Sequence, residues 1–385
     1  MGESTGTTLA NWREHPFSVH GFTHVEELIR TERIAAGAAG ATPFGSGPEL
    51  DLASIPSGSA RARTAADLVA ASHTDGLLVL HRGKVVHEQY GAENGPSARH
   101  IVFSVTKSVC GALAGVLVEK GQLDPDMPVI DLLPEVFGSA YGDCTIRHVL
   151  DMTVSVRFIE DYVDPLGDVA RYRVAMDWNP PGAFPYQGGL HAFLPTLPKD
   201  SHAHGHRFHY VSPNSDLLGW VLERAGGTSM AALLSEHLWA PLGAEQDALI
   251  TVDRQGAART AGGLCASLRD LGRFGEMMRC EGHANGRQVI PAGWIGDIRT
   301  AGDPDAWSRG EMTGLFAKAR YRNYWYVPED GSGTFMAIGI HGQWIYIDPR
   351  AEITIVKLSS QPVPSDEALD RDLVAMFRSI GASLS

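Results

Sequence analysis

The sequence predicts an α+β / α/β fold in which helices flank an antiparallel sheet and a mainly helical part is inserted into it. Strand patterns occur near both ends of the chain, at residues 76–90 and 334–358, and helical patterns dominate between them. Strands that return after a helical insertion are typical of one sheet built from both ends. We therefore expect residues 1–100 and 276–385 to form the two parts of an α/β domain. We expect residues 101–275 to form the mainly helical domain.

Length, charge and cysteine usage exclude several classes of protein. The 385 residues, 44% of them hydrophobic, suffice for a large core and two lobes. Acidic residues outnumber basic ones by 45 to 32, which disfavours nucleic acid and anionic membranes as partners. No run approaches the roughly 18 apolar residues of a membrane span, and the first residues do not read as a secretory signal. The scattered cysteines favour reduced thiols in a cytoplasmic protein; they are Cys110, Cys144, Cys265 and Cys280.

The first elements are a helical stretch and a hairpin. Residues 25–33 carry a short helical pattern. Residues 76–81 and 84–90 alternate as strands, and Arg82-Gly83 between them predicts a two-residue hairpin turn.

A buried helix is predicted from Phe103 to Glu119, with Gly121 at its end. Ser104 and Lys107 lie three residues apart, so their side chains share a face about one turn apart. A lysine desolvated in a dry site has a lowered pKa and can take the proton of a serine hydroxyl. The helix N-terminus offers free N–H groups to an oxyanion. A Ser-x-x-Lys pair occurs by chance about once in a chain of this length, so its context must decide.

The middle of the chain alternates between short helices and one long irregular segment. Short helices are predicted at 130–133 and 146–152, and longer ones at 215–225, 229–239 and 268–278. The polar segment Tyr162–His206 predicts an irregular loop that covers a pocket, because long loops in compact domains are usually functional. Strands are then predicted at 334–340, 343–347 and 352–358, and a closing helix at 366–380.

Two further segments carry residues that suit catalysis. A buried lysine would lower the phenol pKa of a neighbouring Tyr210, which could then relay protons. Asn214 is more simply explained as the cap of the following helix. The glycine-rich strand Ala337–Gln343 could offer a backbone N–H to an oxyanion, although glycine there is also typical of a bulge or tight packing.

In order along residues 65–362, these motifs resemble the serine β-lactamase-related (penicillin-binding-protein-like) family of class C β-lactamase fold. The series includes Ser104-x-x-Lys107, Tyr210-x-Ser212-x-Asn214 and the glycine strand. Within that family, the chain is most similar to the 6-aminohexanoate-dimer (nylon oligomer) hydrolases and related carboxylesterases. The resemblance implies Ser104 as the acylated nucleophile, Lys107 as its proton partner and Tyr210 as general acid/base. It implies an oxyanion hole made by the backbone N–H groups of Ser104 and Ile340.

The resemblance also implies substrate contacts. Tyr162 stands where a tyrosine of the subfamily closes over bound substrate, and Ser212 where lactamases carry an asparagine. Trp178 could line an acyl pocket or fill the core. His341 could bind substrate or be a core histidine, and we weigh the two readings equally.

Departures from the family pattern limit the inference. The lactamase Lys-Thr-Gly is replaced by Ala337-Ile338-Gly339, so efficient β-lactam turnover is not expected. Arg171 and Arg173 stand where the nylon-oligomer enzymes have an acidic pattern, so ester hydrolysis is the safer prediction.

A metal centre is a weaker interpretation. His202, His204, His206 and His209 could place imidazoles on one side of an extended segment, which could suit zinc or copper. No carboxylate or cysteine nearby completes that set, so we expect neither metal nor cofactor.

We therefore predict a cytoplasmic serine hydrolase that cleaves a short ester or linear amide through an acyl-serine. The alternatives are a D-aminopeptidase or DD-peptidase, a weak β-lactamase, and a non-catalytic penicillin-binding sensor. The predicted partner is a small-molecule ester or amide; if the chain assembles, a two-fold homodimer is the commonest form.

Overall fold

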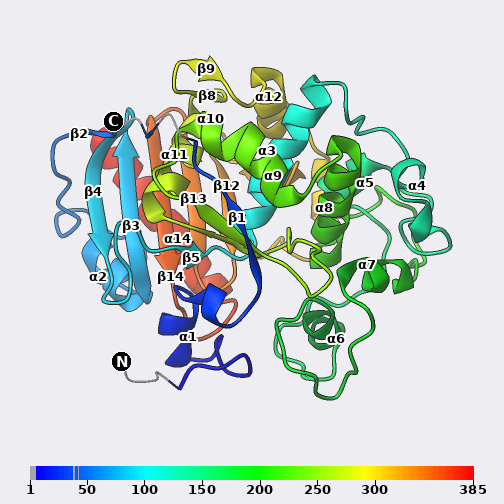
Figure 1. Cartoon of the computed structure of the whole chain (residues 1–385). Helices are drawn as coiled ribbons and strands as arrows, with labels where there is room; N and C mark the ends of the chain where they lie inside the picture. The colour runs from blue at the N-terminus through cyan, green and yellow to red at the C-terminus, as the bar shows by residue number, and fades with distance from the viewer. Residues whose placement is uncertain (1–5, 38–39, 42) are drawn as a thin grey trace.

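An eight-stranded sheet forms the centre of the protein (Figure 1). The computed structural model describes residues 6–37, 40–41 and 43–385. The strand pairs with an assigned register are antiparallel except that of β2 with β4. In spatial order the strands are β10 (Ala319–Arg322), β11 (Trp325–Pro328), β12 (Phe335–Gly339), β13 (Gln343–Asp348), β14 (Ile353–Ser359), β3 (Thr74–His81), β4 (Lys84–Tyr90) and β2 (Gly45–Ser46). The predicted sheet built from both ends of the chain is confirmed, because β14 pairs with β3.

The hairpin of β3 and β4 forms at the predicted turn. His81 pairs with Lys84, which leaves Arg82 and Gly83 as the two loop residues. Both have positive φ values, 52° and 72°. A two-residue turn of this kind requires positive φ at both positions, and glycine adopts it without strain.

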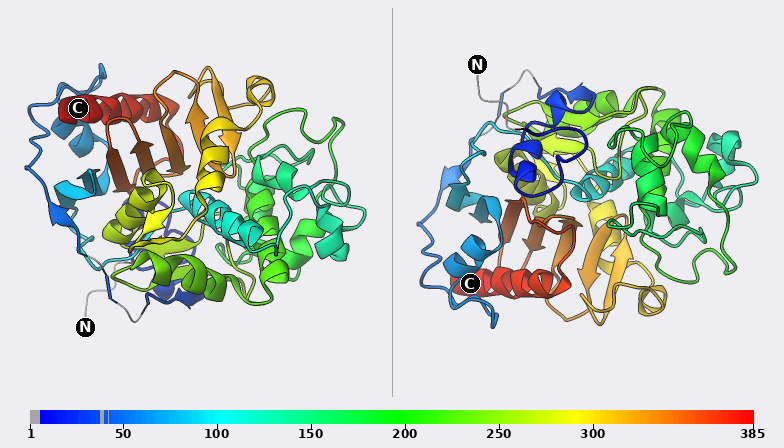
Figure 2. Two further views of the ribbon diagram at one scale, coloured as in Figure 1. Left: turned by 90° about the horizontal axis from the view of Figure 1, so that it is seen from above. Right: turned by 90° about the horizontal axis from the view of Figure 1, so that it is seen from below.

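Helices cover both faces of the large sheet (Figure 2). On one face lies α14 (Glu367–Leu384), where the Phe377 ring packs 5.8 Å from that of Trp344, with α2 (Ala65–Ala71) beside it. On the other face lies α11 (Leu268–Arg279), whose Phe274 stacks on Trp325. The serine N-cap of α11 and the aspartate N-cap of α14 accept backbone N–H groups of their first turns.

A second, four-stranded sheet was not predicted. Its strands are, in order, β1 (Thr31–Ile34), β6 (Ala248–Thr251), β7 (Leu264–Ala266) and β5 (His100–Ile101). The predicted helix at 25–33 is therefore wrong. Only a short 3-10 turn, η1 (Val25–Glu27), forms there, because the next residues extend to pair with β6.

The helical part lies at one side of the sheet (Figure 1). Its elements, as far as the structure describes them, are α3 (Val105–Glu119), α4 (Val129–Leu132), η2 (Pro134–Val136), α5 (Ile146–Leu150), α6 (Asp168–Ala175), α7 (Leu190–Phe193), η3 (Leu194–Thr196), α8 (Ser212–Gly226), α9 (Met230–Leu234), η4 (Ser235–Trp239) and α10 (Ala240–Leu242). Helix α8 packs against α3 and α5. The segment 162–206 is less irregular than predicted, since α6, α7 and η3 form within it.

The remaining elements are short and lie at the edges of the fold. They are α1 (Phe17–Gly21), α12 (Ala292–Thr300), α13 (Pro304–Ser308), and the pair β8 (His283–Ala284) and β9 (Arg287–Gln288). Helices α12 and α13, like strands β10 and β11, were not predicted from the sequence. The four cysteines are free thiols. None of the helices in the described residues combines the length and the apolar character that a membrane span requires.

Candidate active site

Ser104 stands at the N-cap of α3, at the bottom of a cleft. Phe103 before it has φ of 42°, in the left-handed region, so the backbone turns sharply into the helix. Every residue of α3 from Val105 to Leu117 is buried, which makes the helix a rigid support. Ser104 itself is 9% exposed, and its hydroxyl is not used as a helix cap. The hydroxyl is thus both accessible and fixed in place.

Lys107 lies one turn along α3 and contacts Ser104 directly. Its Nζ is 2.8 Å from Ser104 Oγ, 3.3 Å from Ser212 Oγ and 2.6 Å from the carbonyl oxygen of Ala261. Only 1% of Lys107 is exposed. Burial lowers the pKa of Lys107 to about 7, and the negative charge of Glu160 partly opposes that shift. A large share of the amine is therefore unprotonated near neutral pH and can accept a proton.

A buried ion pair fixes the Ala261 carbonyl. Asp216 Oδ1 accepts the backbone N–H of Ala261 at 2.8 Å, and Asp216 Oδ2 pairs with Arg259. The hydroxyl of Tyr172 donates to the same Oδ2. Because an uncompensated charge in this interior would be costly, the three groups hold one arrangement. They position the acceptor that in turn orients the amine of Lys107.

Tyr210 approaches the same pair from the chain segment before α8. Lys107 Nζ lies 5.1 Å from the centre of its ring, and the backbone N–H of Tyr210 is held by Glu311 at 2.9 Å. Burial raises the pKa of Tyr210 above its usual value, and hydrogen bonding to Ser104 only partly offsets this. The predicted fall in its phenol pKa is therefore wrong: the hydroxyl stays protonated and can donate.

Asn214 does not cap α8, contrary to prediction. The N-cap residue is Val211, and Asn214 is fully buried within the first turn. Its Oδ1 accepts the hydroxyl of Tyr141 at 3.1 Å. The helix begins early enough to place Ser212 at its first position, beside Lys107.

Glu160 is a site residue that was not predicted from the sequence. Its carboxylate accepts the backbone N–H of Ser212 at 2.9 Å, the hydroxyl of Ser212, and the hydroxyl of Tyr162 at 2.8 Å. Glu160 thus connects the loop that carries Tyr162 to Ser212, which contacts Lys107. An acidic residue two positions before the tyrosine was the only signal in the sequence.

Strand β12 runs close to the N-terminus of α3. A Cβ atom on Gly339 would lie 2.6 Å from the carbonyl oxygen of Val102 and 3.1 Å from the backbone nitrogen of Ser104. Glycine is therefore needed for the strand to approach this closely. Ile340 follows it, and both Ile340 and Ser104 line the cleft.

Ser104 lies between two pockets. One has a volume of 220 Å³ and is lined by Tyr210, Tyr326 and Leu315, with Glu311 and Asp370. It continues into an outer groove of 670 Å³ beside Val163 and Val363, with which it shares Tyr162 and Pro364. The other is a narrow recess of 20 Å³. Its lining includes Trp178, Ser212, Arg13 and Arg173.

The four predicted substrate contacts divide between the cleft and the core. Tyr162 lines both pockets, and Ser212 and Trp178 line the recess. His341 is 3% exposed and is absent from the lining of both pockets. Its Nδ1 bonds the Gln361 carbonyl oxygen at 2.7 Å, and burial lowers its pKa to about 4. This placement favours the core interpretation of His341.

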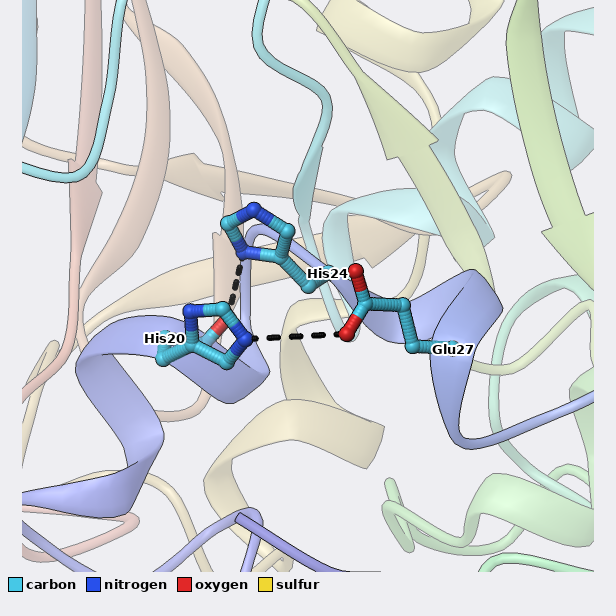
Figure 3. A group of neighbouring side chains, drawn as sticks. All are labelled: His20, His24 and Glu27. Carbon is cyan, nitrogen blue, oxygen red and sulfur yellow. Dashed lines mark hydrogen bonds and ion pairs between the residues drawn. The ribbon is translucent and has the colours of Figure 1, made fainter. Parts of the chain in front are cut away.

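The histidines between residues 202 and 209 do not converge. His204 bonds Asp143 at 2.9 Å, and His209 bonds Glu311 at 3.0 Å. Among the described residues, one group has donor atoms within 4.8 Å of one another: His20, His24 and Glu27 (Figure 3). There the two rings stack at 3.9 Å and 13°, and His24 Nδ1 bonds the His20 carbonyl. Parallel rings do not direct their lone pairs at one ion, so this arrangement is that of stacked histidines beside a carboxylate.

Comparison with known proteins places this geometry among hydrolases. A family model described as Beta-lactamase matches residues 61–377. A curated 6-aminohexanoate-dimer hydrolase of Paenarthrobacter ureafaciens is 36% identical over 363 residues, which covers 93% of this chain and 89% of the relative.

Solved structures share the fold. One described as a candidate 6-aminohexanoate-dimer hydrolase of Bacillus anthracis superposes with a TM-score of 0.90 at 24% identity, over 100% of this chain and 98% of that one. A family VIII carboxylesterase superposes with a TM-score of 0.58 at 15% identity, over 87% of this chain and 99% of that one. At these identities the superpositions show the fold alone.

Proposed function

Because the chain belongs to the beta-lactamase family and is a hydrolase, we propose that it cleaves a small ester or linear amide through an acyl-serine intermediate. The observation that carries the proposal is the contact of 2.8 Å between Lys107 Nζ and Ser104 Oγ, in a site where the pKa of the lysine is about 7. A weakly basic amine beside a serine hydroxyl is the requirement for activating that nucleophile.

The acylation step then uses four residues from three parts of the chain. Neutral Lys107 accepts the proton of Ser104 as Oγ attacks the carbonyl carbon, and the C=O electron pair moves to oxygen. The backbone N–H groups of Ser104 and Ile340 stabilise that oxyanion. When the tetrahedral intermediate collapses, the protonated phenol of Tyr210 gives its proton to the leaving oxygen or nitrogen and recovers one from Lys107. Water releases the acyl group by the reverse sequence.

We expect esters to be turned over faster than linear amides. An alcohol leaves with less need of protonation than an amine, and the raised pKa of Tyr210 makes it a weak acid. The relative's name indicates a linear amide of 6-aminohexanoate as one substrate to test. Efficient β-lactam turnover is not expected, because Ala337 stands in place of the strand lysine.

Intact-protein mass spectrometry during turnover tests the proposal. The wild-type protein is mixed in turn with a series of 4-nitrophenyl esters, the linear aminohexanoate dimer and benzylpenicillin. We expect a transient adduct of acyl mass with esters, and product release at rates that fall from esters to the amide. A stable penicillin adduct without turnover would instead support the peptidase or sensor alternatives, and no adduct with any compound would contradict the acyl-serine mechanism.

Removing the charge of Glu160 should shift the pH dependence of activity. Since Glu160 raises the pKa of Lys107, Glu160→Gln should lower that pKa. The amide oxygen can still accept the hydroxyls of Ser212 and Tyr162, and only the acceptor of the Ser212 backbone N–H is lost. The rise of kcat/KM with pH, which reports deprotonation of the lysine, should move below pH 7 by up to about one unit. Asp161→Asn changes a carboxylate of the same loop that only accepts local backbone N–H groups, and it should leave the profile in place. A profile that stays fixed or moves upward in Glu160→Gln would contradict the role of Lys107 as base.

A further inference from the structure

The recess beside Ser104 contains two arginines that form no salt bridge with any described carboxylate. Arg13 and Arg173 both line it and both are partly buried. Among the residues that the structure describes, neither guanidinium has an ion-pair partner; their hydrogen bonds go to neutral oxygens. Arg13 donates to the Trp178 carbonyl at 3.0 Å and to the Asn179 side chain, and Arg173 donates to the Tyr162 carbonyl at 3.0 Å.

The two positive charges act on each other. Burial, together with the charge of Arg173, lowers the pKa of Arg13 well below its usual range. The third arginine of the recess, Arg259, is neutralised by Asp216. Glu160 also lines the recess; it accepts hydrogen bonds from the neutral Ser212 and Tyr162, and its charge acts on Arg173, which leaves one positive charge in excess. Like charges held together in a partly desolvated recess favour an anion that can bond to both.

The pocket on the other side of Ser104 has the opposite charge. Its lining contains Glu311 and Asp370, together with Glu160, which lines both pockets, and it contains no arginine or lysine. Glu311 is paired with His209. Asp370 has no ion-pair partner among the described residues; burial raises its pKa to about 7, so it carries part of a negative charge near neutral pH and a full one above it. An anionic group would be repelled there and a cationic one attracted. The cleft is therefore polarised across the reacting serine.

We propose that Arg13 and Arg173 bind a carboxylate on the acyl part of the substrate, so that the preferred substrates are monoesters or monoamides of a short dicarboxylic acid. This inference rests on the proposed function of Ser104. Tyr210 decides which pocket each half of the substrate occupies, because it donates the proton to the leaving group. It lines the 220 Å³ pocket and is absent from the lining of the recess. The leaving group thus occupies the larger pocket and its outer groove, and the acyl group extends toward the arginines.

The size of the recess limits the acyl chain. A free volume of 20 Å³ holds about one water-sized group. Only the terminal carboxylate of the acyl group therefore enters the recess, and the methylenes lie in the cleft beside Ser104, whereas the open groove on the other side accepts a long leaving group. The proposed substrates have the opposite charge distribution to the aminohexanoate dimer, whose acyl part carries an amine and whose leaving group carries a carboxylate.

Paired substrates test the inference. Monobenzyl succinate, glutarate and adipate are compared with benzyl butyrate, pentanoate and hexanoate by release of benzyl alcohol. For at least one chain length we expect kcat/KM of the half-ester to exceed that of the uncharged ester by about ten- to a hundredfold, the range of a charge-assisted pair. Arg13→Gln and Arg173→Gln should reduce that ratio toward one, and Arg173→Lys should keep part of it.

A charge-reversal variant distinguishes the loss of the anion site from misfolding. Arg173→Glu should reverse the preference, so that benzyl 6-aminohexanoate is cleaved faster than monobenzyl adipate, while benzyl hexanoate reports the intact catalytic groups. If the uncharged esters are hydrolysed by the wild type but the half-esters are no better, the anion site is wrong and the proposed function stands. If no ester is hydrolysed, the proposed function itself fails.

Discussion

Replacing Ser104 by alanine is expected to lower kcat/KM of ester hydrolysis by at least about 10⁴-fold and to abolish the acyl adduct. The hydroxyl is the group that Lys107 Nζ contacts, and alanine leaves the backbone of Ser104, including its N–H in the proposed oxyanion hole, in place. The measurement is steady-state hydrolysis of a 4-nitrophenyl ester, paired with intact mass during turnover. Circular dichroism should show an unchanged fold, because Ser104 makes no capping bond to α3.

Ser108→Ala supplies a matched control on the same helix. Ser108 is buried and donates to the Tyr324 carbonyl at 2.6 Å, away from the cleft. Its loss should reduce the free energy of unfolding by about 1 kcal/mol and leave ester turnover close to that of the wild type. If Ser104→Ala retains turnover and adduct while Ser108→Ala behaves as expected, the nucleophile lies elsewhere.

Lys107→Met is expected to lower kcat/KM by about 10³-fold, because it removes the proton acceptor while keeping the length of the side chain. Lys357 in β14 provides the comparison. It is also fully buried, burial also lowers its pKa to about 7, and its Nζ donates to the Ser72 carbonyl and the Ser359 hydroxyl. Lys357→Met should therefore leave turnover unchanged. Equal losses in the two variants would mean that the effect of Lys107 is structural.

Lys107 and Lys357 should also make the stability of the wild-type protein depend on pH. Both lysines have pKa values near 7 in the folded chain and about 10.5 when unfolded. Between these values the unfolded chain binds more protons, so the free energy of unfolding rises with pH across that window. Each methionine variant should show a smaller rise in chemical denaturation followed from pH 7 to 10.

Local patterns predicted the elements that hold the nucleophile. The hairpin of β3 and β4 and the buried helix α3 are specified by neighbours in sequence: a two-residue turn, a helical apolar face and a terminating glycine. The same holds for the three-residue spacing that places Lys107 on Ser104. These features need no information from distant parts of the chain.

The features that were missed depend on distant contacts. Strand β1 forms because it pairs with β6, more than 200 residues later, which overrides a local helical pattern. Glu160 acquires its part in the site from Ser212, 52 residues away. For Tyr210, the positive charge of Lys107 was foreseen, but burial, which acts in the opposite direction and prevails, depends on the whole tertiary structure.

The pairing of β14 with β3 has a consequence for how an active molecule is made. The two paired strands, residues 353–359 and 74–81, are separated by more than 270 residues (from 81 to 353), so the middle of the sheet stays open on the ribosome until residues 353–359 have been synthesised. Strand β12, which must reach the nucleophile, is also synthesised late. At about 5–20 residues per second, the nascent chain carries an exposed α3 for roughly 10–50 seconds without a working cleft. Hydrolysis should therefore begin only after β12 and β14 have emerged from the ribosome, and the delay makes the emerging helix a natural client for chaperones.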